Sequence, residues 1–207
     1  MGEKMKGTTH AGIGLAAYAA VSDKFPGGFN YIAMAIVLGA SLLPDIDHPK
    51  SLINRYILPF KNKGAKVTLY LCSGIIVLWF DYIYTNQPAY KALGAALIAV
   101  GLSSHRQGLT HSLLGMITFS FIIGYIGNKY NIKNITSYFI LGYSLHLLCD
   151  MATNRGVPLF YPFKNKKIKL PLTYRVGSKL GNFIELVLVV SGLLYVIYRI
   201  PIITEIK

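Results

Sequence analysis

In the stretch GASLLPDIDHPKS, Gly39–Ser51, an apolar sequence changes abruptly to one rich in ionisable residues. An apolar run from Ala33 to Leu43 ends at a proline, and Asp45, Asp47 and His48 follow at once. The chain has only eight Asp and Glu residues. Two of them therefore stand, with a histidine, at the mouth of an apolar segment, where ionisable groups are costly and are functional candidates by default.

The composition indicates a membrane protein. Hydrophobic residues make up 53% of the 207-residue chain, charged residues make up 14%, and the mean hydropathy is +0.46. Soluble domains usually carry about a quarter charged residues. The formal net charge of +13 would also suit nucleic acid or phosphate-bearing ligands. The basic residues stand in loops between apolar runs, however, which favours the membrane.

Seven apolar segments divide the chain. A full membrane span needs roughly 17–25 residues, and the third, fifth and seventh segments meet that length. We therefore predict an all-α polytopic membrane helix bundle of about six to seven apolar helices, with residues 1–207 as a single integral membrane domain. The approximate segments are Thr9–Val21, Phe29–Leu43, Val67–Tyr84, Ala89–Ser103, Leu109–Ile126, Thr136–Met151 and Phe183–Ile200.

Two long basic loops separate these segments, at about residues 45–66 and 152–179. An apolar island at Tyr56–Phe60 in the first loop predicts a helix at the membrane surface. Most Lys and Arg residues fall on the side that holds the N-terminus and both long loops. The excess of basic residues on the cytoplasmic side of membrane proteins places that side in the cytoplasm.

The histidines and most of the acids gather on this same predicted side. They come from separate parts of the chain, so we expect one face of the bundle to carry a His/Asp cluster. The histidines are His10, His48, His105, His111 and His146, and the acids are Asp45, Asp47, Asp150 and Glu185.

Two short motifs carry the strongest local signals. HLLCD places His146 and Asp150 four residues apart, on one helix face, where both could reach a cation. A structural hydrogen-bonded pair explains that spacing equally well. In HRQGLTHS, Thr110 can cap a helix beginning near His111, and Arg106 offers a bidentate binder for phosphate. The alternative there is a capped turn with solvated histidines.

Imidazole and carboxylate groups indicate metal chemistry. Without thiolates, they are ligands for zinc, manganese or iron. Several such groups can hold two or more ions, which lower the pKa of bound water and bind the oxygens of a phosphoester. The pattern therefore favours metal-assisted hydrolysis. The chain has no GxSxG elbow and no glycine-rich P-loop, so it does not match a serine hydrolase or a P-loop nucleotide hydrolase.

Four motifs together resemble a known family. TTH, LLPDIDH, HRQGLTHS and HLLCDMATNRGVPLFYPF are similar to the YdjM-like family of predicted membrane-bound metal-dependent hydrolases, associated with LexA-regulated genes in some bacteria. The resemblance covers His10 to about Phe163. It implies an integral protein of a bacterial or archaeal cytoplasmic (inner) membrane with a metal site. The family pattern falls on His10, Asp45, Asp47, His48, His105, Arg106, Thr110, His111, Ser112, His146 and Asp150, with a tail at Thr153, Gly156, Pro162 and Phe163.

The family is also distantly similar to zinc-dependent phospholipase C and P1-type nucleases. Those helical enzymes cleave phosphodiesters at a cluster of zinc ions held by His and Asp. They use an N-terminal tryptophan as a metal ligand, whereas the one tryptophan here is Trp79, deep in an apolar segment.

The resulting hypothesis is a membrane-embedded phosphoesterase with its metal site toward the cytoplasm. It would act on a phospholipid or another membrane-proximal phosphate ester through divalent metal, foremost zinc, with two or more ions or manganese as variants. Asp47 is the candidate general base or an orienting group, and Glu185 an orienting group. Arg106 is a candidate catalytic residue, which would neutralise the charge that develops on the phosphate. The candidate substrate-binding residues are Arg106, Thr110, Ser112, Lys164 and Lys166. The candidate metal ligands are His10, Asp45, His48, His105, His111, His146 and Asp150.

Other classes of function stay open. A metal-ion transporter or channel would carry polar residues across the bilayer, and a structural metal would have a closed ligand shell. Membrane lipids are the expected partners. Nucleic-acid binding, which would need stacking residues beside the basic loop at Lys164–Lys169, ranks lowest.

Overall fold

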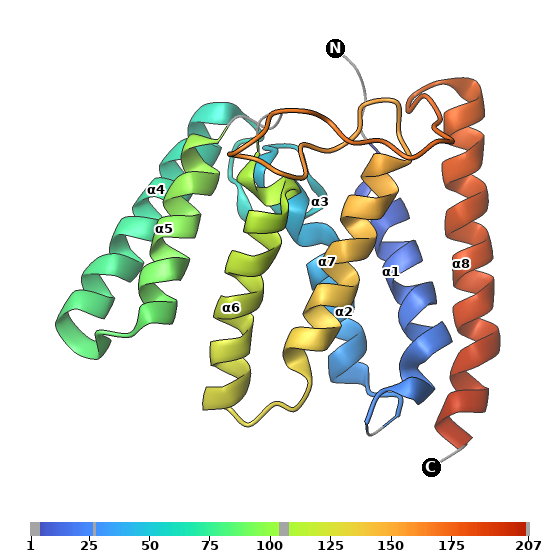
Figure 1. Cartoon of the computed structure of the whole chain (residues 1–207), viewed down its shortest axis with the longest axis horizontal. Helices are drawn as coiled ribbons and strands as arrows, with labels where there is room; N and C mark the ends of the chain where they lie inside the picture. The colour runs from blue at the N-terminus through green and yellow to red at the C-terminus, as the bar shows by residue number, and fades with distance from the viewer. Residues whose placement is uncertain (1–4, 27, 104–107, 206–207) are drawn as a thin grey trace. The chain divides into compact units, whose positions relative to one another are not determined.

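The computed structural model describes residues 5–26, 28–103 and 108–205, and this part of the chain is all-helical (Figure 1). Two isolated β-bridges, Thr153 with Tyr174 and Val157 with Ile168, order the long loop before the last helix. The helices are α1 (Gly7–Val21), α2 (Tyr31–Leu42), α3 (Leu52–Ile57), α4 (Lys63–Phe80), α5 (Pro88–Leu102), α6 (Leu113–Lys129), α7 (Ile135–Met151) and α8 (Lys179–Glu205).

The chain divides into two compact units. The first unit comprises residues 1–42, 137–157 and 167–207, and the second comprises residues 43–136 and 158–166. The first therefore holds α1, α2, α8 and nearly all of α7. The second holds α3 to α6 and the short turns beside them.

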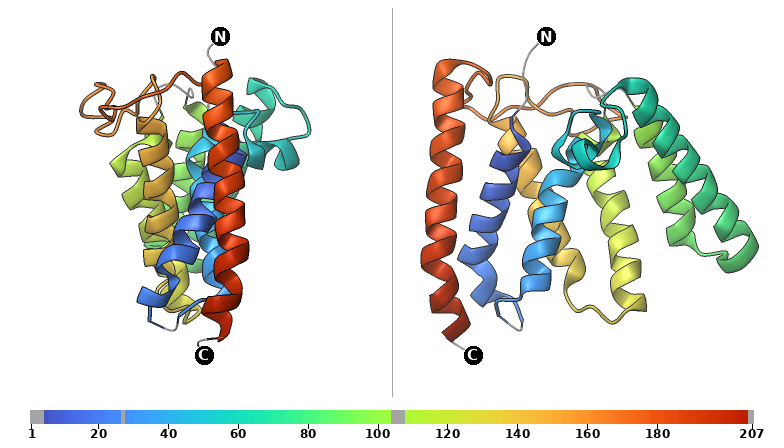
Figure 2. Two further views of the ribbon diagram at one scale, coloured as in Figure 1. Left: turned by 90° about the vertical axis from the view of Figure 1, so that its right-hand side faces the viewer. Right: turned by 180° about the vertical axis from the view of Figure 1, so that it is seen from behind.

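In the first unit, α1 packs against both α2 and α8, and Figure 2 shows α1 and α8 side by side. Small residues permit this close approach, as is common between membrane helices. A β-carbon built on Gly192 would lie 3.3 Å from the carbonyl oxygen of Gly12. Likewise, a β-carbon on Gly142 of α7 would overlap the carbonyl oxygen of Val37 in α2.

Large apolar side chains fill one end of the first unit, where α1 ends and α2 begins. The hydroxyl of Tyr18 donates to the carbonyl of Asn30, and Arg199 pairs with Asp23 at 3.2 Å. The core cluster at this end consists of Tyr18, Phe29, Ala33, Val37, Tyr138 and Ile203.

The second unit is built around the antiparallel pair of α4 and α5 (Figure 1). The short turn η3 (Asp81–Thr85) joins them, and Asn86 leaves it in the left-handed conformation at φ 48°. Side chains start the helices: Asn62 caps α4 and Ser51 caps α3. A cap sets where each helix begins, and so it places the residues of the first turns.

In the part of the chain that the structure describes, two helical segments are long and apolar enough to cross a membrane, Lys63–Thr85 and Lys179–Thr204. Their outward faces carry large apolar side chains; Trp79 is 59% exposed and Ile197 is 68% exposed. The described chain has seven helices of 12 residues or more, but α2 is only about 18 Å long at 1.5 Å per residue. The predicted all-α class is therefore confirmed, whereas a count of six to seven spans is not.

The predicted segments differ from the helices mainly at their ends. The first long loop was expected over 45–66, but α4 already begins at Lys63 because Asn62 caps it. The surface helix expected at Tyr56–Phe60 lies earlier, at Leu52–Ile57, because Ser51 caps it. The fifth segment starts as the turn η4 (Leu109–His111) before α6 begins at Leu113.

Candidate functional site

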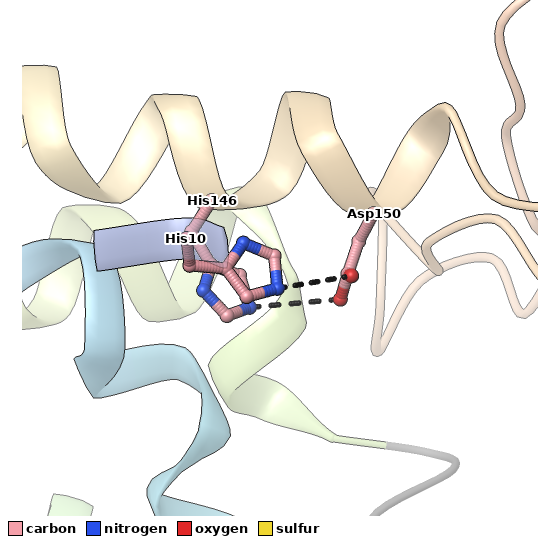
Figure 3. A group of neighbouring side chains, drawn as sticks. All are labelled: His10, His146 and Asp150. Carbon is pink, nitrogen blue, oxygen red and sulfur yellow. Dashed lines mark ion pairs between the residues drawn. The ribbon is translucent and has the colours of Figure 1, made fainter. Parts of the chain in front are cut away.

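His10, His146 and Asp150 come together in the first unit (Figure 3). His10 Nε2 lies 3.4 Å from Asp150 Oδ1, and His146 Nε2 lies 3.5 Å from Asp150 Oδ2. The two imidazole rings stack at 3.8 Å between centroids, with 17° between their planes. One carboxylate therefore faces the same nitrogen of both histidines.

Secondary structure explains how these three side chains meet. His10 is in the first turns of α1, and His146 and Asp150 stand one turn apart near the end of α7. Both histidines are nearly fully buried, at 2% and 1% exposure. The predicted one-face spacing of His146 and Asp150 is present, and the fold adds His10 from far along the chain.

The carbonyl oxygen of Ser41 selects the tautomer of His146. It lies 2.7 Å from His146 Nδ1, and a carbonyl oxygen only accepts hydrogen bonds. Nδ1 therefore carries a proton, and in the neutral ring the lone pair is on Nε2, which faces Asp150. A nitrogen lone pair and a carboxylate oxygen repel each other when they face at this distance. A proton or a metal ion between them would remove that repulsion.

The donor set fits a metal ion. The ligand atoms of His10, His146 and Asp150 all lie within 4.8 Å of one another. Zinc bonds to nitrogen and oxygen are about 2.0–2.2 Å, so donors in a tetrahedral site stand about 3.3 Å apart. Catalytic zinc sites use three protein ligands of these kinds, with water or substrate as the fourth ligand.

Glu185 supports the beginning of α1. Its Oε2 accepts hydrogen bonds from the backbone N–H of Lys6 at 3.1 Å and from the Thr9 hydroxyl at 3.2 Å. The carboxylate is 1% exposed and sits near the positive end of the helix. Because Thr9 directly precedes His10, Glu185 fixes the turn that carries a candidate ligand.

Tyr174 lies near this carboxylate and was not identified from the sequence. Its backbone N–H donates to the carbonyl of Ala152, just past the end of α7. Burial raises the pKa of its hydroxyl, and the charges of Glu185 and Asp150 act in the same direction. Within the described residues, the Tyr174 hydroxyl and Glu185 Oε1 make no hydrogen bond.

Asp45, Asp47 and His111 come together in the second unit. The turn η2 (Leu43–Asp47) supplies both acids, and η4 supplies the histidine. His111 Nε2 lies 3.5 Å from Asp45 Oδ1, whereas Nδ1 lies 3.9 Å from Asp47 Oδ2. The two carboxylates therefore face opposite nitrogens of one ring.

Thr110 connects Asp47 to the ring of His111. Its hydroxyl donates to Asp47 Oδ2 at 3.1 Å and lies 3.2 Å from His111 Nδ1. Because the hydroxyl hydrogen points to the carboxylate, the oxygen can accept the Nδ1 proton. His111 Nε2 is then left to act as a ligand beside Asp45. Asp47 thus has the position of an orienting group, as is common behind metal-bound histidines.

The predicted cap at Thr110 is wrong, because Ser112 caps α6. The Ser112 hydroxyl accepts from the Gly115 N–H at 3.1 Å and donates to the Leu109 carbonyl at 2.6 Å. Thr110 stands one residue before η4 ends, so its side chain turns toward Asp47 instead.

Among the described residues, His48, Lys164 and Lys166 are predicted site residues that the structure does not bring into the group of His10, His146 and Asp150. His48 Nδ1 accepts from the Lys50 N–H at 3.2 Å. Lys164 and Lys166 are exposed on the loop. His105 and Arg106 lie outside the described residues.

Three buried polar residues of the second unit were also missed: Asn54, Lys66 and Tyr70. Lys66 stands in a basic stretch that the sequence marks only as a loop. No local pattern distinguishes it from its exposed neighbours Lys61 and Lys63.

The comparisons with known proteins agree with the membrane character. The model of the family described as YdjM inner membrane protein matches residues 5–203. The chain is 28% identical over 185 residues to the inner membrane protein YdjM of Escherichia coli (strain K12), covering 86% of this chain and 75% of that protein. It is 29% identical over 177 residues to the uncharacterized protein YvsG of Bacillus subtilis (strain 168), covering 84% and 83%. No solved structure gives a significant match.

Proposed function

This chain belongs to the family of YdjM inner membrane proteins, and from that premise we propose that it is a membrane-embedded, metal-dependent hydrolase. The reaction we propose is hydrolysis of a phosphate ester on a phospholipid or another molecule at the membrane surface. The group of His10, His146 and Asp150 is the observation that carries the proposal. It combines two imidazoles and one carboxylate, the number and kind of protein ligands that catalytic zinc sites use.

Each residue has a part in this proposal. His10, His146 and Asp150 would hold a divalent cation, foremost zinc, with manganese as the alternative. The Ser41 carbonyl keeps His146 Nε2 available as a ligand. A bound cation supplies an activated water and a positive charge for the phosphate oxygens.

The second unit would contribute Asp45 and His111 as further ligands. Asp47 and Thr110 orient His111 and keep its Nδ1 protonated. This arrangement favours the orienting role for Asp47 over that of a general base. Two such groups are consistent with more than one metal ion per chain.

A transporter is less well supported than an enzyme. Beyond the metal group, the interior of the first unit is filled by the core cluster that includes Tyr18, Phe29 and Tyr138. At that end the exposed Asp23 is already paired with Arg199. A pathway for ions would need polar groups where these apolar side chains pack.

We propose a multi-pass chain with the metal groups at the cytoplasmic surface. Lys61 and Lys63 stand at the start of α4, Trp79 stands near its far end, and Tyr82 follows in the turn η3. Basic residues mark the cytoplasmic end of a span, and aromatic residues are enriched at interfaces. A metal group at the basic end would lie at headgroup depth, within reach of a lipid phosphate.

Elemental analysis of the detergent-purified protein tests the proposal first. We expect near-stoichiometric zinc or manganese, lost in His146→Ala/Asp150→Ala and retained in the control Asp23→Ala. The metal-loaded protein should then release phosphate or headgroup from phospholipids or prenyl phosphates, and chelation should abolish that release. Absence of metal after supplementation during purification would remove the chemistry on which the hydrolase depends. Tightly held metal without any hydrolysis would favour a structural site.

A further inference from the structure

We infer that α4 holds the acidic turn of the second unit in place through two buried side chains, Lys66 and Tyr70. They are positioning residues, which set the backbone from which Asp45 and Asp47 project. The inference rests on the proposed function, because it assigns those two carboxylates to a metal group.

Lys66 forms the first part of this clamp. Its side chain is 2% exposed, and Nζ donates to the carbonyl oxygens of Asp47 at 3.1 Å, Val100 at 2.9 Å and Ser103 at 2.7 Å. An ammonium group has three N–H donors, so all of them are used. Lys66 is therefore not a binding group for a substrate phosphate, and its bonds instead tie the turn to the end of α5.

Tyr70 forms the second part through Asn54, one helical turn further along α4. The Tyr70 hydroxyl donates to Asn54 Oδ1 at 2.6 Å. The Asn54 amide then donates to the carbonyl oxygens of Ile46 and His48, both at 2.7 Å. Because Tyr70 occupies the amide oxygen, both amide hydrogens are directed at the turn.

Three consecutive carbonyls of the turn, at residues 46, 47 and 48, thus accept bonds from this one network. Ligands on loops need such support, because a metal group requires its donors within a fraction of an ångström. The carbonyl of Asp47 and its carboxylate are both held, by Lys66 and by Thr110. The geometry of the acids therefore depends on α4.

The same lysine also serves the end of α5. The last carbonyls of a helix have no partner within the helix, and a cation near them is favourable. Val100 and Ser103 present such carbonyls to Lys66. One buried charge thus joins the start of α4, the end of α5 and the acidic turn.

Amide hydrogen exchange on the full-length protein in detergent tests the clamp without any metal. We would compare Lys66→Met with Lys63→Met, which removes the same charge from an exposed position on the same helix. Tyr70→Phe is a milder change than Lys66→Met, because it removes only a hydroxyl. Its control is Tyr82→Phe, which removes the same hydroxyl from a side chain that is 85% exposed. We expect residues 43–57 to exchange roughly tenfold faster or more in Lys66→Met and Tyr70→Phe, the effect of losing a strong hydrogen bond.

Zinc affinity, measured on the same proteins with a competing chelator, separates positioning from general stability. We expect Tyr70→Phe to weaken zinc binding by about tenfold, as loss of an outer-shell partner does, with the thermal midpoint little changed. Unchanged exchange in both variants would overturn the clamp, and faster exchange with unchanged zinc affinity would overturn its role in positioning. If the wild-type protein binds no zinc, the proposed function fails, while faster exchange would still support the clamp.

Discussion

In each unit an oxygen atom accepts the Nδ1 proton of a histidine, but the oxygen comes from a different group in each. In the first, the Ser41 carbonyl contacts His146 Nδ1 directly. In the second, Thr110 stands between His111 Nδ1 and the carboxylate of Asp47. In both, Nε2 faces another carboxylate, that of Asp150 or Asp45. A side-chain hydroxyl can be removed by substitution, whereas a backbone carbonyl cannot. The hydrogen bond that orients His111 can therefore be tested directly by changing Thr110.

Among the described side chains, the units also differ in the kind of donors that each brings together. The first brings together three ligand residues, His10, His146 and Asp150. The second pairs Asp45 with His111 and uses Asp47 for orientation. Because the carboxylate of Asp150 faces two histidines at once, we expect the first unit to dominate metal affinity. Single substitutions in each unit test this difference.

Asp150→Ala should have the largest effect, because this carboxylate faces both histidines of the first unit. We expect metal affinity to fall more than about 100-fold, since loss of an outer-shell partner alone typically costs 10–100-fold. Zinc titration against a chelator measures the change, beside Asp23→Ala as the control. Similar losses in Asp150→Ala and Asp45→Ala would mean that the units contribute equally.

Thr110→Val should reduce metal affinity by about tenfold. This is the lower end of the roughly 10–100-fold loss that follows removal of a group that orients a metal ligand. The isosteric methyl of valine neither donates to Asp47 nor accepts from His111. The tautomer with the proton on Nδ1 then loses its hydrogen-bond acceptor. Thr118→Val is the control, because its exposed hydroxyl donates to the Leu114 carbonyl of its own helix. Nitrogen NMR of the His111 ring reports the tautomer. An unchanged tautomer in Thr110→Val would contradict the relay.

Gly142→Ala should destabilise the first unit by about 1–3 kcal/mol, the usual cost of overpacking. The added methyl would overlap the Val37 carbonyl and crowd the Ser41 N–H. Because α2 must move, the contact of Ser41 with His146 should lengthen and metal affinity should fall. Gly39→Ala in α2 meets nothing within 4 Å and should be stabilising by roughly 0.5–1 kcal/mol. Thermal unfolding with and without zinc measures both; equal effects would contradict this packing.

Thr9→Val should have the smallest effect, about 1 kcal/mol for one lost hydrogen bond to Glu185. Thr8→Val, at the exposed neighbouring position, should leave stability unchanged. Thermal unfolding measures the difference. If both substitutions behave alike, the Glu185 contact adds nothing to the first turn of α1.

Much of the site follows from short-range pattern. The four-residue spacing of His146 and Asp150 predicts that they share a helix face, and the structure places them 3.5 Å apart. The LLPDIDH sequence predicts that an apolar helix stops at the proline and is followed at once by two acids, and the turn η2 carries both acids directly after α2. Thr110 was assigned the wrong local role, because two hydroxyl residues near one helix start compete for the cap and Ser112 takes it.

The helical class, the apolar character and the gathering of ionisable residues at helix ends depend on local periodicity, hydropathy and caps, and the sequence alone was enough for them. The partners of the buried polar groups depend on contacts between distant residues. Glu185 bonds to Thr9 across 176 positions, and Lys66 to Ser103 across 37. Nothing in the local pattern separates Lys66 from Lys63. Only the packed fold removes water from one of them, and a buried charge must then find all its hydrogen-bond partners within the protein.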